Sequence, residues 1–121
     1  MDALVSLLPL AAIGFLVDIP WLYTVGGWTQ SMVKKIQGGA PMEMRWAGAP
    51  IVYLAIAFLV QRTRNRLDAF WTGAAVYGIY DFTNYAIFKN YQLEFAIADT
   101  LWGGVLFMAL REIGLRLNLG V

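Results

Sequence analysis

The sequence predicts an all-α fold, a polytopic membrane protein built as an antiparallel bundle of four transmembrane helices. Hydrophobic residues make up 60% of its 121 residues and charged residues only 14%, whereas soluble domains carry about 25% charged residues. The hydrophobic residues lie in four long runs, and about 20 apolar residues are enough for a helix to cross a bilayer. We therefore expect residues 1–121 to form a single four-span membrane domain.

Charged and turn-forming residues set the ends of the expected spans, which are residues 3–24, 46–60, 69–88 and 93–110. Gly26 and Gly27 are expected to stop the first helix, because glycine commonly ends helices. Asp68 is expected to help start the third span. A tight turn at residues 89–91 leads to the fourth.

The connection between the first two spans is the longest in the chain. Within it, Trp28, Met32 and Ile36 share one helical face. This pattern predicts a short helix that lies in the membrane interface. A floppy loop in which the pattern arises by chance is the alternative.

Basic residues predict the orientation, because four spans place both termini on one face of the membrane. Five arginines flank that face and four basic residues flank the other: Arg62, Arg64, Arg66, Arg111 and Arg116 against Lys34, Lys35, Arg45 and Lys89. The positive-inside rule then places both termini in the cytoplasm, by a margin of one residue.

Carboxylates inside the spans indicate a buried polar layer. Asp18 lies six residues before the end of the first span, Asp81 eight residues before Lys89, and Asp99 six residues after Leu93. At 1.5 Å per residue they lie ~9, ~12 and ~9 Å from the same side. We expect them to meet in the half of the membrane opposite the termini.

Each Asp also has a hydrogen-bond donor three positions later, and such residues are neighbours on a helix surface. These donors are Trp21, Asn84 and Trp102. The predicted substrate- or ion-binding residues are Asp18, Trp21, Tyr77, Tyr80, Asp81, Thr83, Asn84, Lys89, Asp99 and Trp102. Because like charges this close cannot all ionise in a dry site, at least one carboxyl group is expected to hold a proton. The alternative is that these groups only satisfy one another and lock the bundle in register.

The remaining polar and small residues of the spans are expected to be structural. The second span is expected to act as a scaffold, with the Tyr53 hydroxyl as its polar group, and Tyr91 is expected in the interfacial aromatic belt. Four glycines are expected to permit close helix approach: Gly73, Gly78, Gly103 and Gly104.

Composition excludes several classes of site and partner. The chain has no cysteine and no histidine, so thiolate or imidazole sites for zinc, copper or haem are excluded, and no cofactor or metal is expected. Its net charge of +1 gives no case for nucleic-acid binding. The expected partners are membrane lipids, together with further copies in a homo-oligomer or a larger membrane complex.

Several motifs resemble the uncharacterised membrane-protein family called domain of unknown function 2177. They are residues 18–22 (DIPWL), 45–53, 80–86 (YDFTNYA), 89–91 (KNY) and 99–103 (DTLWG). Phe82 stands where that family more often has Leu, and Pro20 falls inside the first motif. The resemblance implies four spans and motif positions that include Gly103 and most of the predicted site. It implies no catalytic role, because the family's activity is not established.

Three functions fit these features. The first is transport, or conduction of ions or protons, through the intramembrane acidic-aromatic site, because intramembrane acids usually mark such pathways. The second is a structural or accessory membrane subunit whose polar cluster locks the helices. The third is a lipid-modifying intramembrane enzyme with an Asp as acid or base, which no hydrolase, transferase or redox motif supports.

Overall fold

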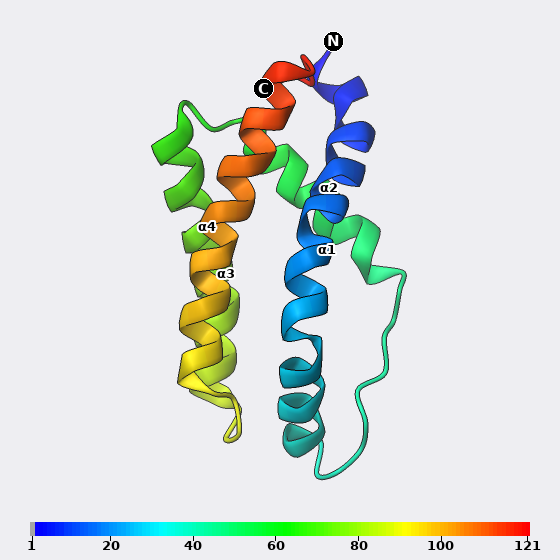
Figure 1. Cartoon of the computed structure of the whole chain (residues 1–121), viewed down its shortest axis with the longest axis vertical. Coiled ribbons are helices and arrows are strands. Elements are labelled where there is room, and N and C mark those ends of the chain that lie inside the picture. Colours follow the sequence, from blue (N-terminus) through cyan, green and yellow to red (C-terminus); the bar gives the residue numbers. More distant parts are fainter. Residues whose placement is uncertain (1) are drawn as a thin grey trace.

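The computed structural model describes residues 2–121, which form four helices and no strand: α1 (Ala3–Ile36), α2 (Gly48–Val60), α3 (Arg66–Ile87) and α4 (Leu93–Arg116). Successive helices run in opposite directions, so that both termini lie at one end of the molecule (Figure 1). The predicted all-α class is confirmed. Two helices, α1 and α4, are long and apolar enough to cross a membrane. The 13 residues of α2 measure only about 20 Å at 1.5 Å per residue.

Helix α1 continues without a break through its two prolines and through Gly26 and Gly27. The predicted stop at these glycines, and with it the separate interfacial helix, is therefore wrong. A glycine inside a helix costs only about 1 kcal/mol, and the segment beyond the glycines packs against the start of α4. Met32, beyond the glycines, and Val25, just before them, belong to a buried apolar cluster with Phe95, and this contact outweighs the weak local preference.

Helix α3 begins three residues earlier than the sequence predicted. Its N-cap is Asn65, whose side-chain oxygen accepts the backbone N–H of Asp68 at 2.8 Å. Asp68 instead accepts the backbone N–H of Arg64 at 2.8 Å. An Asn at the N-cap satisfies one of the first N–H groups of a helix, all of which lack an intrahelical partner.

Helix α4 is the centre of the arrangement, because it contacts each of the other three helices and packs along most of the length of α3. The α3–α4 contact depends on glycine. A methyl group at Gly73 would overlap the Gly103 carbonyl, one at Gly103 would overlap Tyr77, and one at Gly104 would overlap Phe70. The predicted role of these three glycines is confirmed, whereas a methyl group at Gly78 would lie at an ordinary 3.5 Å from the Thr100 methyl group.

Two apolar clusters fill the interior. The larger lies toward the termini and includes Leu10, Ile56, Val60, Leu106, Phe107 and Leu110. The smaller lies near the α3–α4 turn and consists of Val25, Met32, Tyr91, Phe95 and Ala96, with Trp21, Trp28 and Ile36 against it.

Polar contacts tie the helix ends together on the side of the termini. The Gln61 side chain donates to the Ala3 carbonyl at 2.7 Å. The Arg111 guanidinium donates to the Thr63 carbonyl and to the Arg64 carbonyl. Arg111 thus supplies donors to the carbonyl groups of the α2–α3 loop.

Candidate functional site

Three buried carboxylates lie between the two apolar clusters. Asp81 is 0% exposed, Asp18 4% and Asp99 8%. They come from α3, α1 and α4, and Asp99 lies within electrostatic range of both other groups. We call Asp18, Asp81 and Asp99, with the aromatic side chains bonded to them, the acidic layer.

Two tryptophans connect α1 to α4 by crossed hydrogen bonds. The Trp21 indole N–H of α1 donates to Asp99 at 2.9 Å, and the Trp102 N–H of α4 donates to Asp18 at 2.7 Å. The two indoles stack with their centroids 5.4 Å apart and their planes 10° apart. Each tryptophan therefore bonds to the carboxylate of the other helix.

These crossed bonds correct the predicted pairs of Trp21 with Asp18 and of Trp102 with Asp99. Because α1 and α4 run in opposite directions, the order Asp18–Trp21 on α1 faces the order Trp102–Asp99 on α4. Each tryptophan therefore lies level with the carboxylate of the other helix and bonds to it across the interface. Spacing along one helix identified the four residues but not their partners.

Tyr53 of α2 is a member of the acidic layer that the sequence did not assign to the site. Its hydroxyl donates to Asp18 at 2.5 Å, in a buried contact. Asp18 therefore accepts hydrogen bonds from both α2 and α4, and α2 is more than a scaffold. The available signal was that Tyr53 is the polar side chain in the middle of an otherwise apolar helix.

Asp81 has a different environment from the other two carboxylates. One oxygen, Oδ1, accepts the hydroxyl of Tyr91 at 2.6 Å. The other, Oδ2, is buried and accepts no N–H or hydroxyl donor among residues 2–121. The Asp81 carboxyl group also lies within hydrogen-bonding range of the Asp99 carboxyl group. Tyr91 is itself only 7% exposed, so its ring packs inside the protein next to Asp81.

A second unpartnered polar atom lies on the same helix pair. The hydroxyl oxygen of Thr100 is buried and makes no hydrogen bond within the described part of the chain. Thr100 lies against Gly78, which is three residues before Asp81 and so on the same side of α3. The α3–α4 interface thus contains two buried oxygens that could each accept or share a proton.

The other predicted site residues divide into two groups. Tyr77 lies against Gly103 and within electrostatic range of all three carboxylates, and Asn84 is half-buried beside Tyr80 and Tyr91. The outer group consists of Tyr80, Thr83 and Lys89, which are exposed. Among residues 2–121, every hydrogen bond to the three carboxylates comes from Trp21, Trp102, Tyr53 or Tyr91, and none comes from Lys89.

Comparison with protein families places the chain. The family described as "Predicted membrane protein (DUF2177)" matches residues 3–115. The chain belongs to this family. No curated protein and no solved structure matches the chain.

Because the family is one of predicted membrane proteins, lipid is the expected surrounding of the exposed apolar side chains. Leu4, Leu8 and Leu16 of α1 are each more than half exposed, as are Ile79 of α3 and Leu101 of α4. Contiguous exposed apolar surface of this kind is rare on soluble monomers, and in a bilayer it faces hydrocarbon.

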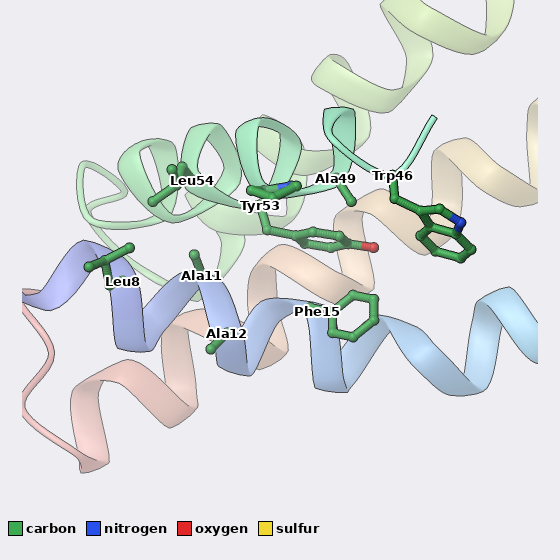
Figure 2. A pocket seen from close by; sticks show the side chains of 9 residues that line it. Leu8, Ala11, Ala12, Phe15, Trp46, Ala49, Tyr53 and Leu54 are labelled. Atoms are coloured by element: carbon green, nitrogen blue, oxygen red, sulfur yellow. The ribbon is translucent and has the colours of Figure 1, made fainter. Parts of the chain in front are cut away.

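A groove of about 390 Å³ lies between α1 and α2, next to Tyr53. It is lined by Leu8, Ala11, Ala12, Phe15, Trp46, Ala49, Pro50, Tyr53 and Leu54. Figure 2 shows the Tyr53 ring lying along the groove, with its hydroxyl oxygen toward the end where Phe15 and Trp46 lie. Tyr53 therefore contacts the groove with its ring and the acidic layer with its hydroxyl.

Proposed function

We propose that this DUF2177 protein is a multi-pass membrane protein whose acidic layer binds a proton and supports transport or proton conduction. The observation that carries the proposal is the fully buried Asp81 carboxyl group, whose Oδ2 accepts no N–H or hydroxyl donor among residues 2–121 and which lies within hydrogen-bonding range of the Asp99 carboxyl group. Buried polar atoms in native proteins are nearly always paired, and an exception calls for a functional or chemical reason. A proton on Asp81 supplies that reason.

The electrostatics of the layer support this proposal. A carboxylate in the membrane costs about 2.5–3.5 kcal/mol on insertion scales, and Asp81 faces a second carboxyl group, Asp99, within interaction range. The hydrogen bonds to these two groups come from the neutral donors Tyr91 and Trp21. A shared proton is then the simplest counter-charge for the Asp81–Asp99 pair.

The membrane arrangement that goes with this function has four spans and both termini in the cytoplasm, within one domain. The 22 residues of α3 measure about 33 Å at 1.5 Å per residue, enough for a bilayer core of about 30 Å. Helix α2 is shorter and packs against α1. A complete pathway in so small a chain needs further copies in a homo-oligomer or a larger complex.

A structural role is the second candidate, and the crossed Trp–Asp bonds favour it. They join α1 to α4 at two points, and the stacked indoles fill the space between them. An accessory subunit with this lock would keep its helices in register without moving protons. The third candidate is a lipid-modifying enzyme. The one feature of residues 2–121 that favours it is a groove close to the acidic layer.

Proton flux and stability measured together distinguish the first two candidates. The wild type, Asp81→Asn and a control, Glu94→Gln, are reconstituted in liposomes with a pH-sensitive dye inside, and their thermal stability is followed in detergent. Glu94 is an exposed acid in the first turn of α4. We expect Asp81→Asn to lose at least tenfold in proton flux with its stability kept, and Glu94→Gln to keep both. If the wild type shows no proton flux at any pH and Asp81→Asn is unstable, the transport proposal is wrong and the structural role is supported.

A further inference from the structure

The groove between α1 and α2 has the chemistry of a site for a single hydrocarbon chain. Its lining includes no charged side chain. Its lining includes three alanines, Ala11 and Ala12 on α1 and Ala49 on α2, whose short side chains leave space between the helices. Larger residues close the two ends, with Leu8 and Leu54 at one and Phe15 and Trp46 at the other (Figure 2).

The groove of about 390 Å³ lies between two neighbouring helices. A narrow extended chain matches both its volume and its apolar lining, whereas a helix at least about 10 Å across could insert only its side chains.

The groove continues as an apolar stripe toward the termini and ends at a cation. Leu54 and Phe58 of α2 and Arg62, two residues beyond the end of α2, follow one another at four-residue spacing, so they lie on one side of this segment. On α1, Leu4 and Leu8 continue the opposite wall and are exposed by 76% and 72%. The stripe from Pro50 to Arg62 is about 18 Å long at 1.5 Å per residue.

Arg62 is held in place at the end of this stripe. Its guanidinium carbon lies 3.4 Å from the centroid of the Phe58 ring, and one N–H group donates to the Phe58 carbonyl at 2.8 Å. Its other N–H groups make no hydrogen bond within residues 2–121. Arginine is well suited to bind phosphate through such free N–H groups.

We propose that the α1–α2 face binds a phospholipid, with one acyl chain in the groove and the phosphate on Arg62. The lining of the groove is uncharged, and the apolar stripe connects the groove to Arg62. Arg62 supplies the positive charge that binds a lipid phosphate. The Tyr53 ring stands edge-on to Phe15, with centroids 5.3 Å apart, and donates to Asp18. An acyl chain against these rings holds the Tyr53 hydroxyl on Asp18, so the lipid occupies a position next to the acidic layer. This site does not depend on proton binding.

Photo-crosslinking with an acyl-chain diazirine analogue of phosphatidylglycerol tests the chain position. In liposomes we expect cross-links in wild type to gather on the peptides that carry Ala12, Phe15 and Leu54. Ala12→Trp fills the groove from an exposed position and should lower these cross-links at least fivefold. Ala55→Trp, on an exposed part of α2 that does not line the groove, should leave them unchanged.

The phosphate position has its own test, which does not depend on tolerance of a large side chain. Arg62→Gln should lower the preference for phosphatidylglycerol over phosphatidylcholine about fivefold in native mass spectrometry, the loss expected for one arginine at a lipid surface. Arg116→Gln removes the same charge at the same end of the molecule and should not change it. Three results would each overturn the proposal. They are cross-links spread evenly over α1 to α4, the same cross-link yield in Ala12→Trp and Ala55→Trp, and cross-links that join two protein chains through the groove.

Discussion

Helix α4 meets α3 and α1 in two different ways. Its contact with α3 is made by glycines, so that the backbone at Gly73 touches the backbone at Gly103 and aromatic rings cover Gly103 and Gly104. Its contact with α1 at the same level is made by Trp21 and Trp102, which donate to Asp99 and Asp18.

The difference between these interfaces indicates which helix contact can respond to a change in protonation. Helices α3 and α4 cannot separate without cost at their close backbone contact, because any separation leaves a void and loses dispersion contacts. Hydrogen bonds to a carboxyl group depend on whether that group is charged, since bonds to an ionised acceptor are about twice as strong. We therefore expect α3 and α4 to behave as one rigid pair, and the α1–α4 contact to respond to protonation.

The largest expected effect is at the glycine contact. Gly73→Ala places a methyl group on the Gly103 carbonyl, where backbone rather than a flexible side chain must move. Overpacking of this kind costs about 1–3 kcal/mol or more. The control is Gly78→Ala on the same helix, where a methyl group meets Thr100 at an ordinary 3.5 Å and helix propensity improves by about 1 kcal/mol. Equal unfolding free energies for the two variants, measured by denaturation in detergent, would show that close backbone approach is not what holds α3 to α4.

A smaller loss is expected at the crossed bonds. Trp102→Phe removes the N–H that Asp18 accepts and leaves the Tyr53 hydroxyl as its donor. A lost hydrogen bond to a buried acceptor costs about 1–3 kcal/mol. Trp21→Phe should cost a similar amount at Asp99.

The double variant at these two tryptophans shows whether the crossed bonds act together. Because the indoles stack on one another, we expect the loss in the double variant to be at least 0.5 kcal/mol smaller than the sum of the two single losses, as for contacting residues in general. Additive losses would mean that the two bonds are independent.

The smallest effect is expected at Asp68, which lies in the first turn of α3 and precedes the expected third span. The Arg64 backbone N–H, followed by the Arg64 charge, holds the pKa of Asp68 below its ordinary value. A depressed folded pKa stabilises the protein above the ordinary value and loses this contribution as the pH falls through the folded pKa. Asp68→Asn should therefore lower the Tm slightly at pH 7, and the difference from wild type should shrink below about pH 3.9. Glu43→Gln, at an exposed loop position, should show no such dependence on pH.

The sequence predicted the helical class and the buried carboxylates because these depend on composition and on position along each helix. Asp18, Asp81 and Asp99 were singled out as carboxylates inside apolar spans, and their distances to the expected span ends placed them in one layer. The partners of these groups were not predicted, because they depend on how helices cross. Tyr53 and Tyr91 donate to carboxylates 35 and 10 residues away in the chain, and no local pattern gives that pairing.

The length of α1 was missed for a related reason. Gly26 and Gly27 have a low helix propensity, but propensity is a weak term beside tertiary packing. The segment after them packs Met32 against Phe95 and its neighbours. This contact lies 63 residues away in the sequence, so the local reading ended the helix too early.

Infrared spectroscopy of the protein in lipid at pH 7, with isotope-labelled aspartate, tests the central claim that Asp81 holds a proton. A protonated carboxyl group gives a C=O stretch that shifts in D2O, and a carboxylate gives none. We expect this band in the wild type and in Glu94→Gln, and its loss in Asp81→Asn. A wild-type spectrum without the band, or a band that persists unchanged in Asp81→Asn, would contradict the proposed proton site.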